Sequence, residues 1–511
     1  MTPLIFVALA MEFAVAGTNL RFVLEHSPTP EKHMLETMPG GIAVFDYNND
    51  GKPDIFFANG AELPALRKTS AKYHNRLFRN EGGWQFTDVT AQAGLAGEGY
   101  AIGAAAGDFD GDGHVDLFVA GVYRNTLYRN LGQGQFADVS AASGIRSNEW
   151  SVAGGWFDFD NDGKLDLLVT NYGRIDLKNP RSCGTPRIYC HPRYYDPRPN
   201  QLYRNLGGGK FADVSAAAGM APHLGRGMSI AFADYDADGR MDAFVTNDNL
   251  PNFLFHNLGG GKFEEAALLA GVALLDHGKT VASMGTDFRD FDNDGRPDLV
   301  VTALNGETFP LFRNQGGGVF QDATASTGLG RLTNQYSGWG VGLVDFDNDG
   351  WKDLFTANSH VNDLVEKFEA ATYRQASTVF RNQSGRFVAA VTGLEKAVAA
   401  HRGAAFADFD NDGRIDAVVT VLGAPAELWR NVSPTRHWIG VKVDVIGTRI
   451  RIGAQVDHMS TSVGYASSVH APVHFGLGGV TKVERIEITW PSGQTKVLEG
   501  VAADQVITVR P

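Results

Sequence analysis

The sequence predicts an all-β protein, a seven-bladed β-propeller with a small C-terminal β-domain. Three observations support this prediction. A nine-residue acidic turn recurs seven times at intervals of 50 to 76 residues. Each turn is followed by a short apolar segment typical of a strand, such as Leu167-Leu168-Val169-Thr170. Each repeat then carries a Leu-aromatic-Arg-Asn type of tetrad and, in the first six, a further short strand, which gives the four strands of a propeller blade.

The acidic turn at residues 158–166 shows the pattern most completely. It reads Asp-Phe-Asp-Asn-Asp-Gly-Lys-Leu-Asp, with carboxylates at positions 1, 3, 5 and 9 and a glycine at position 6 that permits a sharp bend. Oxygen donors at alternate positions suit Ca²⁺, and position 7 would add its backbone carbonyl. An EF-hand closes with Glu at position 12 on a helix, whereas this turn closes with Asp before a strand. We therefore expect a calcium loop between two strands.

All seven turns offer the same donors, which makes the alternative of a merely solvated turn remote. Only the first turn departs from the all-Asp pattern, with Asn48 at position 3. The sequence predicts up to seven bound Ca²⁺ ions. The predicted ligands, including the carbonyl of each position 7, are Asp46, Asn48, Asp50, Lys52, Asp54; Asp108, Asp110, Asp112, His114, Asp116; Asp158, Asp160, Asp162, Lys164, Asp166; Asp234, Asp236, Asp238, Arg240, Asp242; Asp290, Asp292, Asp294, Arg296, Asp298; Asp345, Asp347, Asp349, Trp351, Asp353; and Asp408, Asp410, Asp412, Arg414, Asp416.

The net charge of −13 has its origin in these turns, which hold nearly half of the 58 acidic residues. The acidity therefore indicates metal binding, and no basic patch with interleaved aromatic residues suggests nucleic acid. No segment reaches the roughly 18 apolar residues of a membrane span. Cys183 and Cys190 are the only cysteines and predict a local disulfide in an exported protein, with two free thiols as the alternative. We expect a secreted, extracellular or periplasmic monomer.

Residues 1–25 allow two interpretations. The apolar run Leu4 to Met11 and the sequence Ala14-Val15-Ala16 are typical of a signal peptide and its cleavage site, but a basic start is missing and Glu12 interrupts the run. Alternatively, the segment Phe13 to Phe22 is a strand. The seventh tetrad has no fourth strand after it, so this segment is expected to pair with the last blade and close the ring.

The propeller is expected to span residues 26–431, and residues 432–511 to form a separate small β-domain. Trp438 to Val443 and Arg485 to Trp490 alternate with the period of a strand. Two insertions interrupt the repeats. Residues 171–200 hold both cysteines and several arginines and tyrosines, and residues 359–375 show helical spacing. Each insertion is either a functional loop or a cap on the propeller face.

Two groups of motifs resemble a known family. The repeated acidic turn is similar to the FG-GAP/VCBS repeat of integrin α-chain propellers. The segments Ile452-Gly453-Ala454, His474-Phe475-Gly476-Leu477-Gly478 and Trp490-Pro491-Ser492-Gly493 resemble the ASPIC/UnbV domain. The combination resembles the cartilage acidic protein family and its bacterial relatives. The resemblance implies a secreted, calcium-binding propeller of the adhesion or matrix type, and it implies no catalytic residues.

Two functions are compatible with this sequence. The favoured hypothesis is a non-catalytic module that binds an extracellular protein or glycan, with calcium stabilising each blade. The motifs His-Glu-x-x-His and Gly-x-Ser-x-Gly of metalloproteases and hydrolases do not occur. The alternative is an exported enzyme that acts on polysaccharide, with its site in the central channel or on the face formed by residues 171–200.

Overall fold

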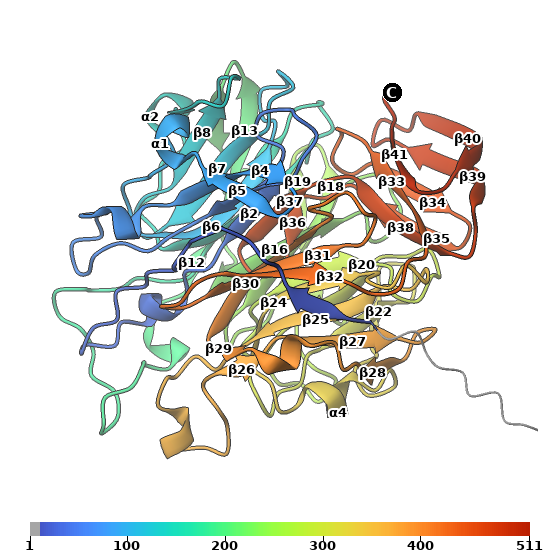
Figure 1. The fold of residues 1–511 in the computed structure, drawn as a ribbon. Helices are drawn as coiled ribbons and strands as arrows, with labels where there is room; N and C mark the ends of the chain where they lie inside the picture. The colour runs from blue at the N-terminus through green and yellow to red at the C-terminus, as the bar shows by residue number, and fades with distance from the viewer. Residues whose placement is uncertain (1–10) are drawn as a thin grey trace, which may run out of the picture.

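Seven sheets form a closed ring in the computed structural model, which describes residues 11–511 (Figure 1). Each contains four antiparallel blade strands, and the sheet of the first blade has two more. The innermost strands of neighbouring sheets contact one another around the ring, and the last contacts the first. This arrangement is a seven-bladed propeller, so the predicted fold class is confirmed. The innermost strands are β2 (Ile42–Phe45), β6 (Ala101–Gly107), β10 (Ser151–Phe157), β16 (Gly227–Ala233), β20 (Thr286–Arg289), β24 (Gly338–Val344) and β30 (His401–Ala407).

The second strand of every blade begins at position 9 of its acidic turn. These strands are β3 (Asp54–Phe57), β7 (Asp116–Gly121), β11 (Asp166–Asn171), β17 (Asp242–Asn247), β21 (Asp298–Val301), β25 (Asp353–Asn358) and β31 (Asp416–Val421). The third strands carry the tetrads and are β4 (Arg76–Gly82), β8 (Thr126–Asn130), β13 (Gln201–Gly207), β18 (Phe253–Gly259), β22 (Leu311–Asn314), β27 (Thr378–Asn382) and β32 (Glu427–Asn431). The first six fourth strands are β5 (Gln85–Asp88), β9 (Phe136–Asp138), β14 (Lys210–Asp213), β19 (Lys262–Glu265), β23 (Phe320–Asp322) and β28 (Phe387–Ala389).

The fourth strand of the last blade comes from the other end of the chain. β1 (Phe13–Val15) pairs antiparallel with β32, with Phe13 opposite Asn431 and Val15 opposite Trp429. The Phe13 ring packs edge-on against Phe346 at 5.4 Å. The pairing agrees with the strand expected from this segment. The expected signal sequence falls mostly on residues 1–10, which lie outside the described residues.

Within residues 11–511, the helical segments among the strands are short turns. The α-helical turns are α1 (Thr90–Ala93), α2 (Ser140–Ser143), α3 (Ala267–Ala270) and α4 (Leu329–Thr333), and the 3-10 turns are η1 (Met34–Thr37), η2 (Ala71–Tyr73), η3 (Pro192–Tyr194), η4 (Val365–Lys367) and η5 (Leu394–Lys396). Two small ladders join insertions, between β12 (Arg198–Pro199) and β15 (Leu224–Gly225) and between β26 (Gln375–Ala376) and β29 (Val398–Ala399). None of the helices in residues 11–511 is long and apolar enough to cross a membrane.

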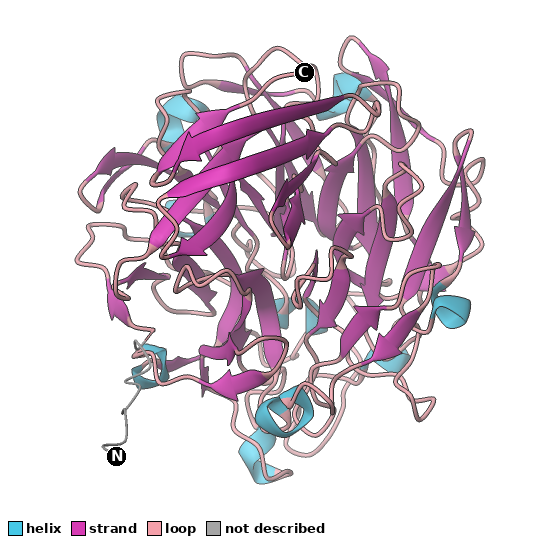
Figure 2. Cartoon of the chain, turned by 90° about the vertical axis from the view of Figure 1, so that its right-hand side faces the viewer, coloured by secondary structure: helices cyan, strands magenta, loops and turns pink. Residues whose placement is uncertain are grey.

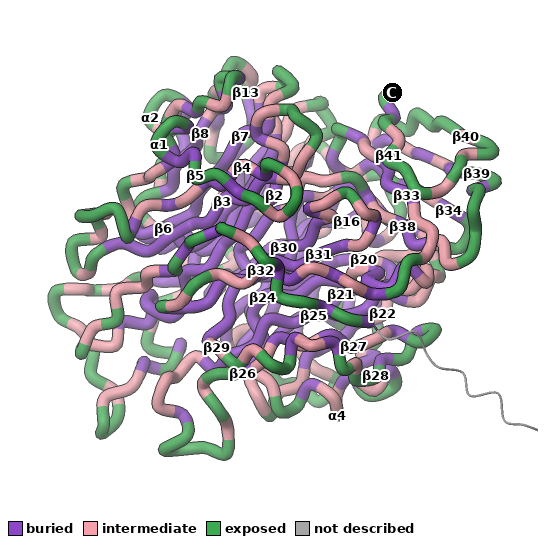
Figure 3. The backbone as a smooth tube through the Cα atoms, viewed as in Figure 1, coloured by how far each residue is buried: buried purple, intermediate pink, exposed green. Residues whose placement is uncertain are grey.

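The aromatic residue at position 2 of each acidic turn points into the blade core, as its alternation with the acidic positions predicts. All seven of these side chains are buried, and burial follows the inner strands while the outer turns are exposed (Figure 3). The helix expected within residues 359–375 does not form. Only η4 is helical there, because a bridge between Ser359 and Arg374 closes the insertion into a loop and Phe368 lies half exposed.

The C-terminal segment adds two further sheets that lie across one face of the ring (Figure 2). One contains β33 (His437–Lys442), β38 (Val473–Gly478) and β41 (Gln505–Thr508), with β41 parallel to β33. The other contains β34 (Arg449–Ile452), β35 (Gln455–His458), β39 (Lys482–Thr489) and β40 (Thr495–Ala502). The apolar side chains of this segment share a core with the second and third blades.

A hairpin from residues 432–511, the segment expected to form a separate small β-domain, enters the propeller. The hairpin comprises β36 (Ser462–Val463) and β37 (Ser467–His470). β37 pairs parallel with β2, which makes the sheet of the first blade six-stranded. Between these strands, the Gly464 carbonyl accepts the Thr286 N–H and the Ala466 carbonyl accepts the Ala104 N–H. We call residues 462–470 the channel plug.

Tyr465 forms the centre of the channel plug. It is fully buried, its hydroxyl donates to the Met38 carbonyl at 2.8 Å, and its ring packs edge-on against Trp339 at 4.9 Å. Small residues on the inner strands make room, since a side chain on Gly41 or Gly103 would collide with the plug backbone or the Ala466 methyl. The channel is therefore filled at this level by protein side chains.

Candidate metal centre

Each acidic turn is wrapped around its first carboxylate. In the third blade, Asp158 accepts the N–H of Asp162 at 3.1 Å and the N–H of Gly163 at 2.8 Å. Gly163 has φ +83°, the left-handed conformation that the sharp bend requires. The same pair of bonds recurs in all seven turns. The acidic side chains consequently converge, as the calcium-loop interpretation requires.

The carboxylate at position 9 lies deepest. Asp166 is fully buried and accepts the N–H of Asn205 at 2.7 Å and the N–H of Phe159 at 3.2 Å. Burial, reinforced by neighbouring carboxylates such as Asp160, raises the pKa of Asp166 to about 8. The corresponding burial raises the pKa of Asp116 to about 8 as well. A divalent cation beside these groups would supply the positive charge that the ionised form lacks.

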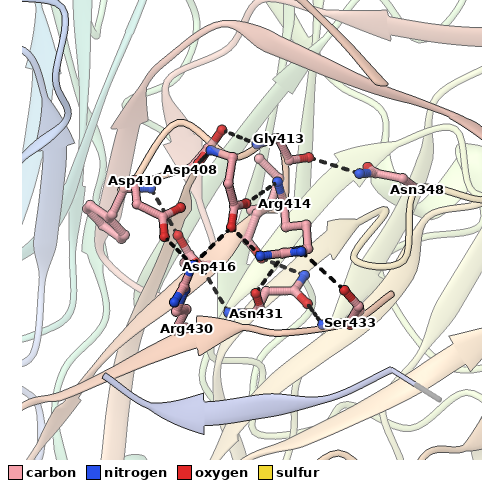
Figure 4. Close-up of polar contacts among 12 residues, drawn as sticks. Asn348, Asp408, Asp410, Gly413, Arg414, Asp416, Arg430, Asn431 and Ser433 are labelled. Atoms are coloured by element: carbon pink, nitrogen blue, oxygen red, sulfur yellow. Dashed lines mark hydrogen bonds and ion pairs between the residues drawn. The ribbon is translucent and has the colours of Figure 1, made fainter. Parts of the chain in front are cut away.

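The carboxylate at position 3 has an oxygen without a partner. In the last blade, Asp410 Oδ2 pairs with Arg430 at 2.9 Å, whereas Asp410 Oδ1 is buried and accepts no hydrogen bond (Figure 4). The same buried Oδ1 without a hydrogen bond or ion pair occurs at position 3 of four further all-Asp turns, in Asp110, Asp160, Asp236 and Asp292. In the sixth turn, Asp347 Oδ1 lies 3.1 Å from Arg436. Buried acceptors almost always find a partner in folded proteins. Five equivalent exceptions are what a cation position shared by these turns would produce.

The unpartnered oxygens lie beside further acidic groups. In Asp108, Asp110 and Asp116, and likewise in Asp158, Asp160 and Asp166, one oxygen from each carboxylate lies within 4.8 Å of the other two. The trios Asp234, Asp236, Asp238 and Asp290, Asp292, Asp294 meet the same criterion. A hard cation that takes oxygen ligands at 2.3–2.6 Å suits such a donor set. The residues present therefore fit Ca²⁺.

The seven turns are not equivalent. In the first, the Asn48 amide donates to Asp50 at 3.2 Å, so position 3 contributes an amide in place of a carboxylate. In the sixth, the C-terminal segment covers the turn, and Asp347 lies 3.1 Å from Arg436 as well as 2.8 Å from Arg381. The first site has less negative charge, and the sixth is the most enclosed.

The side chain at position 7 has a role that the sequence did not indicate. Arg240 pairs with Asp238 and also donates to the Asn257 carbonyl at 2.7 Å, and Arg296 and Arg414 make the equivalent contacts. Lys164 pairs with Asp162 at 2.8 Å. These cations neutralise part of the charge at position 5.

The recurring tetrad completes each turn. Its arginine pairs with the carboxylate at position 3 in five blades, at distances from 2.5 to 2.9 Å. In the fourth blade, His256 replaces this arginine and lies 3.2 Å from Asp242. In the first blade, Arg79 pairs with Glu81 because Asn48 offers no charge. The tetrad was recognisable in the sequence, but its contact with the acidic turn was not.

The tetrad asparagine joins neighbouring blades. Asn205 donates through its side-chain amide to the Leu165 carbonyl in its own blade and to the Phe109 carbonyl in the preceding blade, at 3.0 and 2.8 Å. Equivalent bonds occur in all seven blades. The carbonyl in the preceding blade is always that of position 2 of its acidic turn. One side chain per blade therefore ties the acidic turns into a continuous ring.

A buried charge cluster fastens the C-terminal segment beside the turns. Asp457 lies 2.5 Å from Arg289 and 3.3 Å from Lys352. Burial opposes the ionised form, but these two cations outweigh it and hold the pKa of Asp457 well below its usual range. Asp287 is also paired with Arg289, at 3.5 Å. These two carboxylates are engaged in structural ion pairs and are not free for proton transfer.

A cavity of about 1270 Å³ lies between the turn face and the C-terminal segment. Its wall includes the first three acidic turns, together with Lys52, Lys164, Lys442 and Arg510. The central channel beyond it is filled by the channel plug. In the described structure, the open cavity therefore lies at the acidic turns and not in the central channel.

Comparison with known families decides the assignment. Residues 46–119, 108–169, 188–245, 234–301 and 290–356 match the FG-GAP-like repeat family and together cover more than half of the chain. The chain belongs to the FG-GAP-like repeat family. Residues 431–511 of this FG-GAP-like repeat protein match the ASPIC and UnbV family. Both resemblances drawn from the sequence are confirmed.

Curated relatives agree with this assignment. The FG-GAP-like repeat protein is 27% identical to cartilage acidic protein 1 of Homo sapiens over 337 residues, which cover 61% of this chain and 48% of the human protein. It is 27% identical to cartilage acidic protein 1 of Mus musculus over 338 residues, 61% of this chain and 49% of the mouse protein. The chain spans about half the length of the curated relatives it matches.

Solved structures show more distant likenesses. A lectin of Agrocybe aegerita that recognises non-reducing terminal N-acetylglucosamine aligns with a TM-score of 0.40 and 16% identity, over 76% of this chain and 93% of the lectin. YCF48 bound to D1 peptide aligns with a TM-score of 0.44 and 10% identity, over 84% of this chain and 98% of YCF48. At these TM-scores the likenesses carry no argument about function.

Proposed function

We propose that the acidic turns bind Ca²⁺ and that the calcium-loaded propeller is a non-catalytic module for binding an extracellular protein or glycan. The observation that carries the calcium proposal is the unpartnered, buried Oδ1 at position 3 of five of the six all-Asp turns. Carboxylates at positions 1, 5 and 9 would complete the ligand set with the carbonyl of position 7. The bound ion would neutralise each cluster and hold the first two strands of the blade together.

The proposal of an exported protein rests on two features. Cys183 and Cys190 form a disulfide, which persists in oxidising compartments. Calcium loops of modest affinity also suit the extracellular space, where the ion is abundant. The family relation to cartilage acidic protein 1 supports a matrix or adhesion role. The proposal places ligand contacts on the insertions and the turn face, because the channel plug fills the channel.

The experiment that tests the calcium proposal is metal analysis after equilibrium dialysis. Protein stripped with EDTA is dialysed against 1 mM CaCl₂, and bound calcium is measured per chain by mass spectrometry of the ashed protein. We expect several ions per chain in calcium, and fewer in a variant in which Asp110, Asp160 and Asp292 are replaced by Asn. Binding of less than one ion per chain would contradict the proposal. Magnesium at the same concentration serves as the control for a non-selective acidic surface.

A further inference from the structure

The insertion of the third blade carries positive charge on an otherwise acidic chain. The whole chain has a net charge of −13, but residues 171–200, which we call the basic insertion, contain only two acidic residues, Asp176 and Asp196. Arg198 pairs with Glu149. Within residues 11–511, no carboxylate lies within 4.0 Å of the other five basic side chains of the insertion. Four of these five side chains are exposed to solvent. The five are Arg174, Lys178, Arg181, Arg187 and Arg193.

The basic insertion is held in one conformation. The disulfide between Cys183 and Cys190 closes its tip, and the Ile188 N–H donates to the Cys183 carbonyl at 2.8 Å. Beside the disulfide, the Tyr189 hydroxyl donates to Glu36 at 3.1 Å. Groups that are already fixed lose less entropy when they bind a ligand. The arginines are therefore presented as a preformed surface.

The arginines are arranged around one exposed ring. Tyr194 is 41% exposed, and the guanidinium groups of Arg181 and Arg193 lie 4.7 and 5.0 Å from its ring centre. Arg187 donates through Nη2 to the Arg181 carbonyl at 3.1 Å, while its Nε is buried and has no partner. Guanidinium groups recognise sulfate and carboxylate oxygens through paired N–H donors. The exposed guanidinium groups of Arg181 and Arg193 therefore suit an anionic ligand.

From this arrangement we propose that the basic insertion binds a linear sulfated polysaccharide, an inference that rests on the proposed role as a ligand-binding module. A peptide that adds to a sheet needs an open strand edge, whereas the described strands of the basic insertion are the two-residue β12, already paired with β15, and a closed turn. An acidic peptide would meet the same arginines, so the test compares poly-glutamate with the polysaccharide. A lipid surface would require exposed apolar side chains. Tyr194 is the one large hydrophobic residue of the insertion that is strongly exposed, and two guanidinium groups flank its ring.

Binding at the basic insertion does not involve the acidic turns directly. β11 follows the turn at residues 158–166 and precedes the insertion, so the two lie at opposite ends of a six-residue strand, roughly 20 Å apart. The insertion also lies on the opposite side of the ring from the C-terminal strands (Figure 1). The polysaccharide would therefore bind the folded protein equally well in calcium and in EDTA at a temperature where both forms are folded.

The test uses a heparin-derived dodecasaccharide and measures its affinity for the full chain by calorimetry at 150 mM NaCl. We expect Arg181→Ser/Arg193→Ser to weaken binding at least tenfold. The matched control is Arg146→Ser/Arg331→Ser, which removes two exposed arginines that also lack an acidic partner, and it is expected to change affinity less than twofold. Arg181→Lys/Arg193→Lys keeps the charge and removes the paired donors, so an intermediate loss is expected.

Three outcomes would overturn the inference. They are absence of dodecasaccharide binding, equal losses in the two serine double variants, and tighter binding of poly-glutamate or of vesicles with 30% phosphatidylserine than of the dodecasaccharide. Thermal melting of each variant in calcium verifies that it is folded. Failure of the inference is distinguishable from failure of the calcium proposal, because calcium content is measured on the same protein without any polysaccharide.

Discussion

The side-chain amide of Asn80 donates to the backbone carbonyl of Phe409 at 2.9 Å, across the junction between the first and last blades. The same side chain donates to Pro53 in its own blade at 3.2 Å. Equivalent asparagines donate the same pair of hydrogen bonds at each of the remaining blade junctions. The ring therefore depends on a repeated polar contact at each acidic turn as well as on the apolar packing between blades.

The first prediction concerns this contact. Asn205→Ala leaves the buried carbonyls of Phe109 and Leu165 without their donor, so we expect a loss of about 2–3 kcal/mol in the free energy of unfolding. Chemical denaturation in calcium measures it. The control is Asn179→Ala, an exposed asparagine that donates only to Asp176, for which we expect less than about 0.5 kcal/mol. Similar losses in both variants would show that the junction bond contributes little.

The second prediction separates a metal ligand from an ordinary surface acid. Asp160→Asn keeps the shape of the side chain but removes one carboxylate from the third turn. In calcium we expect it to destabilise the protein by about 1.4 kcal/mol for each tenfold loss of affinity at saturation. In EDTA we expect no loss or a gain, because like charges at Asp158 and Asp162 are relieved.

The reverse substitution is available in the first blade. Asn48→Asp would complete the all-Asp pattern, so we expect it to stabilise the protein in calcium and to destabilise it in EDTA. The metal explanation would be contradicted if either Asp160→Asn or Asn48→Asp changed the free energy of unfolding in the same direction in calcium and in EDTA. Asp166→Ala should cost more than Asn48→Ala, because it also leaves the Asn205 and Phe159 N–H groups unpaired.

The third prediction concerns the channel plug. Tyr465 is fully buried and hydrogen-bonded to Met38. We expect Tyr465→Phe to cost about 1–2 kcal/mol through the lost hydrogen bond, and Tyr465→Ala about 3–5 kcal/mol through the cavity that it leaves. Because the plug joins the C-terminal segment to the ring, calorimetry should show one cooperative transition. Two independent transitions in the wild type would mean that the segment unfolds separately.

The fourth prediction is a pH dependence at His458. Burial, and secondarily the Arg289 guanidinium, lowers the pKa of His458 to about 4. The unfolded chain binds this proton near pH 6.5, so the folded state loses stability as the pH falls from 6.5 towards 4, by up to about 1.4 kcal/mol per pH unit. In His458→Gln, which keeps a donor towards the Phe232 carbonyl, this part of the loss should vanish.

The informative quantity for His458 is the difference between wild type and variant across this pH range, measured by denaturation in calcium. Other titrating groups contribute to both proteins and cancel in the difference. A difference that stays constant from pH 7 to pH 4.5 would mean that His458 is not buried in its neutral form.

The blades could be predicted from the sequence because the local structure of each repeat depends on residues within that repeat. The glycine at position 6, the alternating carboxylates and the following apolar strand require no distant partner. The closing strand was also predictable, since the seventh tetrad lacks a successor. By contrast, the entry of Ser462–Val463 and Ser467–His470 into the channel could not be foreseen, because a short strand of small residues shows no preference for a particular edge.

The site was predictable to the same extent. The convergence of the acidic side chains follows from the turn itself, whereas the contacts of Arg204 and Asn205 depend on how the third strand pairs with the second. The tetrad was a visible signal of this role, but nothing in its spacing names the acidic turn as its partner. The helix expected near Val365 failed for a similar reason. Helical spacing of apolar residues carried no information on the bridge that closes this loop.

Thermal melting in calcium and in EDTA tests the central claim most directly. If the turns bind calcium in the folded protein alone, each site contributes about 2.7 kcal/mol at one hundred times its Kd, so the midpoint should rise by many degrees when 1 mM CaCl₂ replaces EDTA. A midpoint that is the same in both solutions would contradict the account.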